Sequence, residues 1–250
     1  EILFHAMRGE DQNDSSTFSH DVWKRERKAV KKIGVPRNFL KEGVDADVLE
    51  RFEGTLTALR TKGYEIVDVS MPHLPYTLPV YYVVMPAEAS TNLARYDGIR
   101  YGLSVDGADV TDIYTKTRGR GFGQEVRRRI LIGTFVLSSG YADQYYRKAT
   151  AVRELLRADF KNVFENVDVI TMPTTPTPAF RAGEKSDPLA MYVADIFTAS
   201  MNLTGVPAIS TPMGRVTRDG AELPIRIQIA APHCGEAALF TNGKVVENLA

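Results

Sequence analysis

The segment from residue 33 to residue 69 restricts the fold of this chain more than any other. It opens with a short apolar run, Ile33–Val35, that Pro36 closes and that is typical of a buried strand. Apolar residues then recur at the spacing of one helix face, at Val48, Leu49, Phe52, Leu56 and Leu59. Gly63 can end that helix, and Tyr64–Val69 follows as a second strand. A strand, a helix and a strand in this order predict a parallel pair.

The rest of the chain repeats this alternation of helices and short apolar strands. Asp47 and Glu50 predict a capping box for the first long helix. Further helices are predicted over Tyr81–Arg95 despite Pro86, within Gly121–Ala149, along the stripe Tyr145–Val163, from Asp187 to about Leu203 and over Gly235–Leu249. Strands are predicted at Val169–Met172, Ala208–Pro212 and Leu223–Ile229. Residues 97–112 are predicted as a loop, and the proline-rich run 173–180 as an extended segment.

These elements predict an α/β fold with a mixed, mostly parallel sheet covered by helices. We expect a single domain over residues 1–250, in which residues 1–32 are a truncated helix and a connector and residues 33–250 are the α/β body. The basic run Lys24–Lys32 in that connector favours a solvated linker over a phosphate-binding site. Because the chain starts at Glu1, inside an apparent helix, we expect it to be a fragment or a processed product.

Composition excludes several classes of protein. The chain has 31 Lys and Arg and 31 Asp and Glu, so its net charge of zero gives no general attraction to nucleic acid or to an anionic membrane. A single cysteine, Cys234, excludes an internal disulfide and is compatible with a reducing compartment. No apolar run approaches the length of about 18 residues that a membrane span requires.

The segment Gly121–Ala149 carries three consecutive arginines, Arg127, Arg128 and Arg129, on a predicted helix that continues into apolar residues. Neighbouring side chains on a helix point about 100° apart, so at most one or two of these arginines face inward. A guanidinium at the edge of a pocket suits a carboxylate, because its planar fork donates two parallel hydrogen bonds. The segment therefore predicts a carboxylate-binding site.

Other kinds of active site find little support in the sequence. Ser138 and Ser139 lack a G-x-S-x-G turn and a nearby histidine, which favours a role at the end of the helix over a role as nucleophile. The four histidines show no metal-ligand spacing, and neither a Walker motif nor a dinucleotide glycine fingerprint is present.

Asp195 lies among apolar residues in MYVADIFTAS, so its carboxylate must be paired or kept in contact with water. One interpretation is a structural salt bridge with Arg129. The alternative is that Arg129 and Asp195 face one cavity and offer a cation to a carboxylate and an anion to an ammonium group. In that case they would form a receptor for a free α-amino acid.

Five blocks of the chain together resemble the amidase-signature family, and within it the glutamine-hydrolysing subunits of tRNA-dependent amidotransferases. The blocks run in the family's order over essentially the whole chain: RYDGIRYG (95–102), GFGQEVRRRILIGTFVLSSGYADQYYRKA (121–149), DVITMPTTPTPAF (168–180), DPLAMYVADIFTASMNLTGVPAIS (187–210) and LPIRIQIAAP (223–232). The resemblance implies the amidase-signature fold, of which this chain would be the carboxy-terminal part.

The resemblance also implies roles for individual residues. The family uses a Ser–cis-Ser–Lys triad, and its Gly/Ser-rich signature is missing from this sequence, so we expect no catalytic residue here and an inactive isolated chain. Motif matching implies that Arg129 binds the α-carboxylate of glutamine and that Asp195 binds its α-ammonium. Tyr81 is the expected hydroxyl donor near the substrate, with Tyr82 as the alternative.

For the whole enzyme the resemblance implies cytoplasmic glutamine hydrolysis with transfer of ammonia. The ammonia would convert mischarged Glu-tRNA(Gln) or Asp-tRNA(Asn) on partner subunits B and C, so that tRNA is contacted only through the complex. ATP and Mg are then expected in a partner subunit, and no cofactor in this chain. Two rival hypotheses remain: a fragment of another amidase-signature hydrolase, and a non-catalytic module that binds amino acids.

Overall fold

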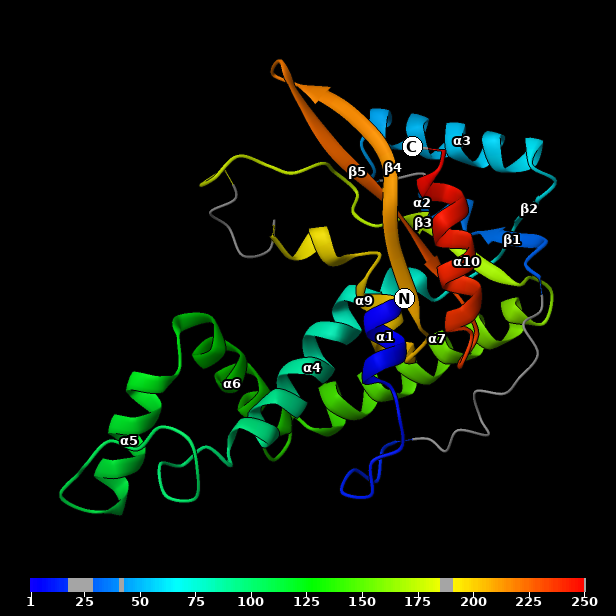
Figure 1. The fold of residues 1–250 in the computed structure, drawn as a ribbon. Helices are drawn as coiled ribbons and strands as arrows, with labels where there is room; N and C mark the ends of the chain where they lie inside the picture. Colours follow the sequence, from blue (N-terminus) through cyan, green and yellow to red (C-terminus); the bar gives the residue numbers. More distant parts are fainter. Residues whose placement is uncertain (18–28, 41–42, 185–190, 250) are drawn as a thin grey trace. The chain divides into compact units, whose positions relative to one another are not determined.

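The structure is a computed structural model that describes residues 1–17, 29–40, 43–184 and 191–249 (Figure 1). Its helices are α1 Ile2–Met7, α2 Arg37–Leu40, α3 Ala46–Thr61, α4 Thr77–Leu93, α5 Val110–Gly121, α6 Gln124–Leu137, α7 Lys148–Phe164, α9 Ala199–Thr204 and α10 Glu236–Glu247. Its strands are β1 Lys32–Val35, β2 Glu65–Asp68, β3 Val169–Pro173, β4 Ala208–Arg218 and β5 Ala221–Ala230.

The five strands form one sheet in the order β2-β1-β3-β5-β4. Strand β1 pairs in parallel with β2 and with β3, whereas β5 runs antiparallel to both β3 and β4. In the described sheet, β5 therefore opposes four strands that point the same way. The mixed, mostly parallel sheet and the predicted β-α-β unit of residues 33–69 are both confirmed.

The core lies on both faces of the central strand β3, whose five residues are all buried. Val169 and Thr171 line a small apolar cavity together with residues of α3 and α10, so these two helices cover the same face of the sheet. Ile170 and Met172 point to the opposite face and are also buried. A strand buried on both faces explains why this run is apolar except for Thr171, whose hydroxyl donates a hydrogen bond of 2.8 Å to the carbonyl oxygen of Gln228.

Strands β4 and β5 are longer than the sequence pattern predicts, and they form a hairpin. They are joined by Asp219 and Gly220, which adopt positive φ angles of 51° and 77°. Positive φ at both central residues is the requirement of a type I′ turn, which matches the twist of the flanking strands. An Asp-Gly pair is a strong hairpin signal, and the sequence contains it at this point.

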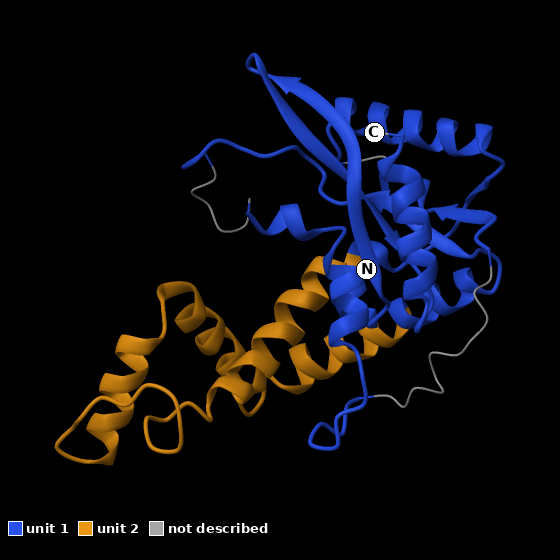
Figure 2. Ribbon diagram, in the orientation of Figure 1, with its two compact units in different colours: residues 1–75, 156–250 blue, residues 76–155 orange. Residues whose placement is uncertain are grey.

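The contacts of the chain group into two compact units (Figure 2). Unit 1 comprises residues 1–75 and 156–250 and contains the whole sheet. Unit 2 comprises residues 76–155 and contains α4, α5, α6, a π-helical turn at Asp143–Arg147 and the first part of α7. The expectation of a single domain stays a prediction.

Within unit 2, helices α4 and α6 pack at very close range. Gly133 of α6 is buried, and a Cβ atom at this position would lie 1.9 Å from the carbonyl oxygen of Pro86 in α4. Pro86 is buried inside α4 without ending it. Gly133 is therefore the residue that allows the backbones of α4 and α6 to meet.

Three predictions about local structure need correction. Helix α5 was not predicted. Residues 97–112 were expected to be a loop, but the loop ends before Val110, where α5 begins. The capping box is wrong: α3 begins after Asp45, and both Asp45 and Asp47 bind Arg218 Nη2, at 2.7 Å each. These carboxylates therefore form a surface ion pair with Arg218, and neither caps the helix through its side chain.

The third correction concerns the segment from Asp187 to about Leu203, which was predicted as one helix. Its first residues fall in 185–190, outside the described part. Met191 and Tyr192 are α-helical as predicted, but a 3₁₀ turn at Val193–Asp195 and a turn over residues 196–198 then interrupt the helix before α9. The basic run Lys24–Lys32 also lies partly outside the described residues, so its role stays a prediction. None of the described helices combines the length and hydrophobicity that crossing a bilayer requires.

Candidate functional site

The three arginines of α6 have different surroundings, as the helix geometry predicts. Arg127 is exposed, whereas the side chains of Arg128 and Arg129 are only 37% and 38% exposed. Glu125, one turn earlier, contacts both: its Oε2 accepts a hydrogen bond of 2.8 Å from Arg128 Nη1, and its Oε1 lies 3.4 Å from Arg129 Nε. Glu125 therefore restrains two neighbouring guanidinium groups.

Arg129 keeps an unsatisfied hydrogen-bond donor. Its Nε is shielded from solvent and makes no hydrogen bond, because the nearby Glu125 oxygen is an ion-pair contact without hydrogen-bond geometry. A buried donor without an acceptor costs about 1–3 kcal/mol. An oxygen-rich anion that reached this guanidinium would therefore gain a hydrogen bond in addition to the charge interaction.

Tyr81 and Tyr82 lie in α4 and are both half-buried. Their rings pack edge to face, with centroids 5.2 Å apart and an angle of 86° between the ring planes. Because the two side chains are similarly buried, burial does not decide which of them is the hydroxyl donor, and Tyr81 stays a prediction with Tyr82 as the alternative. Tyr81 and Arg129 do lie on the two helices, α4 and α6, that meet at Gly133.

Asp195 is the last residue of the 3₁₀ turn, and it is exposed. The apolar residues around it in the sequence therefore do not bury this residue. Asp195 belongs to unit 1, whereas Tyr81 and Arg129 belong to unit 2. The three predicted residues thus fall in two units, and their joint role stays a prediction.

The predicted helix end at Ser138 is confirmed. Helix α6 stops at Leu137, and the hydroxyl of Ser138 donates a hydrogen bond of 2.7 Å to the carbonyl oxygen of Phe135. Gly140 follows with a φ of +85°. Ser138 and Gly140 therefore serve the turn after the helix, as the absence of a nucleophile motif indicated.

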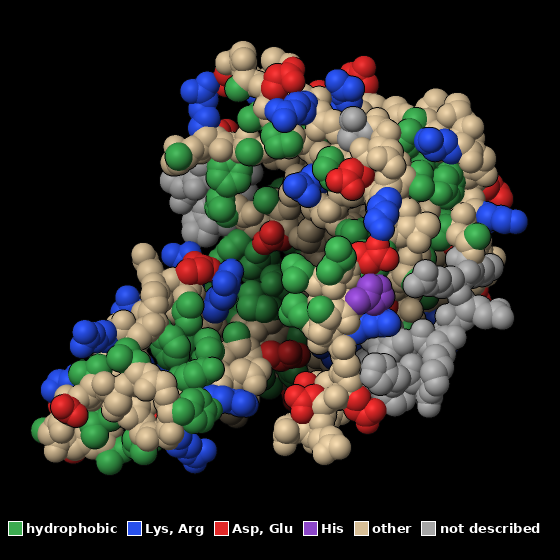
Figure 3. All heavy atoms as spheres, in the orientation of Figure 1, with side chains coloured by type: hydrophobic (Ala, Val, Ile, Leu, Met, Phe, Trp, Pro, Cys, Tyr) green, Lys and Arg blue, Asp and Glu red, His purple; other side chains and the backbone are tan. Residues whose placement is uncertain are grey.

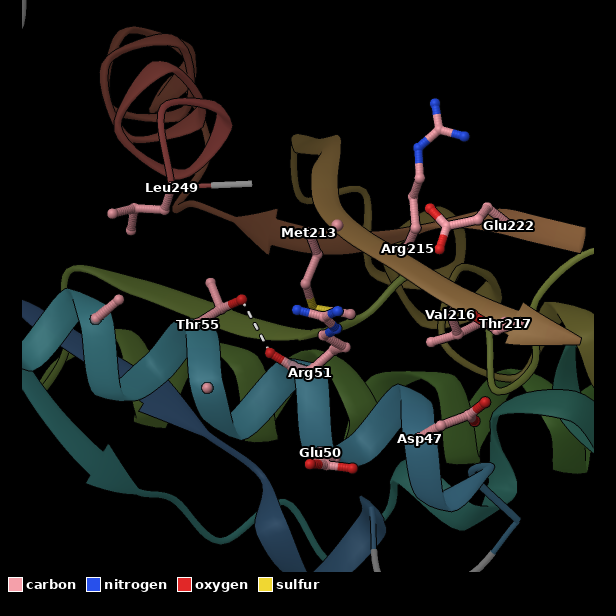
Figure 4. A pocket seen from close by; sticks show the side chains of 13 residues that line it. Asp47, Glu50, Arg51, Thr55, Met213, Arg215, Val216, Thr217, Glu222 and Leu249 are labelled. Carbon is pink, nitrogen blue, oxygen red and sulfur yellow. Dashed lines mark hydrogen bonds between the residues drawn. The ribbon is translucent and has the colours of Figure 1, made fainter.

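An open groove of about 760 Å³ in unit 1 contains none of the predicted site residues (Figure 4). It lies between α3 and the β4–β5 hairpin and includes Arg51 and Glu50 on one side and Arg215 and Glu222 on the other. Charges of both signs line it, and the guanidinium of Arg215 points away from the helix. Within the described ranges, no group of three His, Cys, Asp or Glu residues could hold a metal ion.

A contact between His73 and Asp159 has no counterpart among the sequence predictions. The two carboxylate oxygens of Asp159 accept a hydrogen bond from the backbone N–H of His73 and meet its Nδ1, both at 2.9 Å. Asp159 is buried, so these bonds satisfy a charge that water cannot reach. Because 86 residues separate the pair, local patterns cannot predict it.

Comparison with known proteins places the chain in a family. A model of the amidase family matches residues 1–240. The chain belongs to the amidase family. It is 47% identical over its whole length to the A subunit of glutamyl-tRNA(Gln) amidotransferase from Azorhizobium caulinodans, and 52% identical over 87% of its length to the protein of that name from Acidobacterium capsulatum.

Solved amidase structures agree with this placement. The crystal structure of the A subunit of glutamyl-tRNA(Gln) amidotransferase from Thermotoga maritima matches 96% of the chain with a TM-score of 0.68 and 33% identity. A bacterial aryl acylamidase of the amidase-signature family matches with a TM-score of 0.66 at 16% identity, which shows the shared fold alone. The amidase-signature fold is therefore confirmed.

The chain spans about half the length of the relatives it matches. It covers 52% of the Azorhizobium protein, 46% of the Acidobacterium protein and 48% of the Thermotoga chain. The relatives are named as subunits of an amidotransferase, so this chain is similar to proteins that are named as parts of a complex.

Proposed function

We propose that this chain is the glutamine-recognising part of a glutamine-hydrolysing amidotransferase subunit. The observation that carries the proposal is 47% identity, over the whole chain, with the A subunit of an amidotransferase that is named for glutamyl-tRNA(Gln). Solved amidases with other names match at 23% identity or less, so they share the fold and give no support for their own substrates.

Arg129 is the proposed receptor for the α-carboxylate of glutamine. Its guanidinium is partly exposed, is restrained by Glu125 and has an Nε without a hydrogen-bond acceptor. A carboxylate can accept two parallel hydrogen bonds from such a group. Arg128 already donates to Glu125 at 2.8 Å, which favours Arg129 as the arginine that is available to a ligand.

Asp195 and Tyr81 complete the proposed receptor. An exposed carboxylate at Asp195 suits the α-ammonium group, and a hydroxyl at Tyr81, or alternatively at Tyr82, suits a polar group of the substrate. A cation and an anion that bind the same ligand would select a zwitterionic amino acid and leave its side-chain amide free for reaction. These roles rest on the matched motifs and on the chemistry of the residues.

The proposed reaction begins with attack of a serine on the side-chain amide of glutamine. That serine belongs to the family's Ser–cis-Ser–Lys triad, whose Gly/Ser-rich signature this sequence does not contain, so we assign recognition and no bond cleavage to the chain. As the serine oxygen bonds to the amide carbon, the C–N bond breaks and the leaving amino group takes up the proton that the serine loses, so it departs as ammonia. Water then hydrolyses the acyl-enzyme to glutamate and returns a proton to the serine.

The ammonia would pass to companion subunits B and C in the cytoplasm, where mischarged Glu-tRNA(Gln) or Asp-tRNA(Asn) is amidated. ATP and Mg would serve the activation step in a companion subunit. The equal numbers of acidic and basic residues agree with a chain that meets tRNA only through the complex.

The test uses the full-length protein and measures ammonia release from glutamine. Arg129→Ala is expected to raise the KM for glutamine roughly thirtyfold, because loss of a hydrogen-bonded charge contact costs about 2 kcal/mol. Arg127→Ala is the matched control, since Arg127 is exposed on the same helix, and it should leave KM unchanged. An unchanged KM in Arg129→Ala would make Arg129 structural, and faster hydrolysis of simple aliphatic or aryl amides than of glutamine would assign another amidase activity.

A further inference from the structure

Glu125 lies in the first turn of α6, one turn before the two arginines that it contacts. Gly123, which precedes the helix, has no side chain to cap it, and a carboxylate in the first turn interacts favourably with the helix dipole. Side chains three and four residues apart on a helix are neighbours, so Glu125 reaches both Arg128 and Arg129. The sequence of α6 thus places one carboxylate beside two guanidinium groups.

The carboxylate of Glu125 engages these arginines in different ways. Arg128 Nη1 donates a hydrogen bond of 2.8 Å to Oε2. Arg129 Nε lies 3.4 Å from Oε1 in an ion pair without a hydrogen bond. In the described part of the chain, Nη1 and Nη2 of Arg129 form no hydrogen bond either. Glu125 therefore occupies a donor of Arg128 and leaves the donors of Arg129 to a ligand.

Glu125 also restricts the orientation of Arg129. An arginine side chain has several rotatable bonds, and ordering it for a ligand costs free energy. The carboxylate lies on the Nε side of the guanidinium, and Nε itself is shielded from solvent. The terminal nitrogens can receive a second carboxylate while Glu125 keeps its contact. Arg129 is thus oriented before a ligand binds.

The charge of Glu125 matters because unit 2 is basic. Residues 76–155 include 11 Lys and Arg but 8 Asp and Glu, and Figure 3 shows Lys and Arg side chains at the surface of this unit. Two adjacent guanidinium groups alone would attract any small anion, and most strongly one with two negative charges. With one carboxylate beside them, Arg128 and Arg129 keep a net charge of +1. That charge matches the single α-carboxylate of an amino acid.

We propose that Glu125 is a positioning residue that makes Arg129 selective for an amino acid over an inorganic dianion. It holds the guanidinium in place for one carboxylate, and its negative charge lowers the attraction of the arginine pair for a dianion. The inference rests on the proposed function, in which Arg129 binds the α-carboxylate of glutamine. Glu125 acts through Arg129, and we assign it no contact with the substrate.

The first experiment measures ammonia release from glutamine by the full-length protein. Glu125→Gln keeps an acceptor for Arg128 but removes the charge, whereas Glu125→Ala removes both. Each variant should raise the KM for glutamine about three- to tenfold, because Arg129 must then be ordered by the substrate. The kcat should stay unchanged, since the contact with the α-carboxylate is the same before and during the reaction.

The matched control is Glu154→Gln in α7. Glu154 is exposed, and its Oε1 lies 3.7 Å from Arg153 Nε, which is also shielded from solvent without a hydrogen bond. The substitution removes the same charge beside another arginine of unit 2, and it should leave KM unchanged. Circular dichroism should give the wild-type helix content for the control and for both Glu125 variants.

The Arg129→Ala background shows whether Glu125 acts through Arg129. Arg129→Ala alone should raise KM, and adding Glu125→Ala should produce no further rise, because the group that Glu125 positions is then absent. A purely structural contribution of Glu125 would instead multiply the two effects.

Inhibition by inorganic sulfate, at constant ionic strength, tests the selectivity. Both Glu125 variants should bind sulfate several times more tightly than the wild type, since a negative charge beside two guanidinium groups has been removed. Glutamine gains little from this change, because the zwitterion has no net charge. A KM that rises while the inhibition constant of sulfate falls is a result that loss of structure would not produce.

The outcomes separate this inference from the proposed function. An unchanged KM in Arg129→Ala would overturn the receptor role of Arg129 and this inference with it. A raised KM in Arg129→Ala with an unchanged KM in both Glu125 variants would overturn the inference alone. Full additivity of Glu125→Ala and Arg129→Ala, or sulfate inhibition that does not strengthen in the Glu125 variants, would also overturn it.

Discussion

Unit 1 and unit 2 bury their apolar side chains to very different extents. Unit 1 has a sheet with a core on both faces, in which Phe52, Phe160, Ile170 and Ile227 are almost completely buried. Unit 2 is described at every residue, and its buried hydrophobic side chains are small: Val80, Val84, Ala87, Val136 and Ala149. Fourteen hydrophobic side chains of unit 2 are exposed, and all of them except Val110 are larger than valine.

The two units therefore differ in the interactions that stabilise their backbone conformation. The sheet of unit 1 is stabilised by burial, at about 25 cal/mol for each Å² of apolar surface removed from water. In unit 2, one close helix contact at Gly133 and a set of hydrogen bonds around Arg118 hold the backbone.

The largest expected effect is on the free energy of unfolding, when the same substitution, Phe→Ala, is made in each unit. Phe52→Ala should lower the free energy of unfolding by about 3–5 kcal/mol, because Phe52 is fully buried against the sheet. Phe135→Ala should cost less than about 1 kcal/mol, since half of this side chain is exposed. Urea unfolding followed by circular dichroism measures both. Similar losses at the two positions would remove the distinction between the units.

A second comparison tests the helix contact of unit 2. Gly133→Ala should cost about 3 kcal/mol, because the new Cβ would meet the Pro86 backbone, which cannot rotate away. Hydrogen exchange should then rise in residues 77–93 and 124–137. Gly119→Ala is the control, since a Cβ at Gly119 meets nothing within 4 Å, and it should stabilise α5 by roughly 0.5–1 kcal/mol. Equal exchange in both variants would show that α4 and α6 do not meet at Gly133.

The smallest effect concerns the loop between α4 and α5, residues 94–109, at low pH. The backbone N–H groups of Ile99 and Arg100 donate hydrogen bonds to Asp97 Oδ1, at 2.8 and 3.3 Å, and the bond from Ile99 above all holds the pKa of Asp97 below its ordinary value. Its stabilising contribution is therefore present above the ordinary value of 3.8 and is lost as pH falls through the lowered value. Amide protection in residues 96–104 should therefore decrease below about pH 3.8 in the wild type. Asp97→Asn should show reduced protection already at neutral pH and little further change in acid. A wild-type pH profile in Asp97→Asn would mean that another group closes the turn.

The sequence predicts the sheet well because its evidence is local. Ile33–Val35, the helical spacing from Val48 to Leu59, and the alternation of Ile225, Ile227 and Ile229 each reflect burial against one surface, and the structure confirms all three. Helix α5 escaped prediction because the glycines at its end and the aspartates at its start are typical of loops.

Contacts between distant residues set the limit of such prediction. Asp47 resembles a helix cap in the sequence, yet its carboxylate binds Arg218, 171 residues away. The interruption of the helix over residues 193–198 is not marked by any Gly or Pro within Met191–Thr198. For the candidate site, helix geometry predicts only that at most one or two of the three arginines face inward, and the structure shows Arg127 exposed and Arg128 and Arg129 partly buried. The choice of Arg129 as ligand came from the family motif and remains a prediction.

The most direct test of the proposed glutamine receptor matches each residue to the substrate group that it should bind. In the full-length protein, Arg129→Ala should weaken binding of glutamine roughly thirtyfold and leave binding of γ-aminobutyramide, which is glutamine without its α-carboxylate, unchanged. Asp195→Asn should weaken binding of glutamine and leave binding of glutaramate, which lacks the α-ammonium group, unchanged. The dissociation constants are measured by calorimetric titration of each variant with glutamine and with its truncated ligand, beside the wild-type protein. Equal losses for glutamine and for the truncated ligands would contradict the proposed receptor, because neither residue would then be binding the charged group assigned to it.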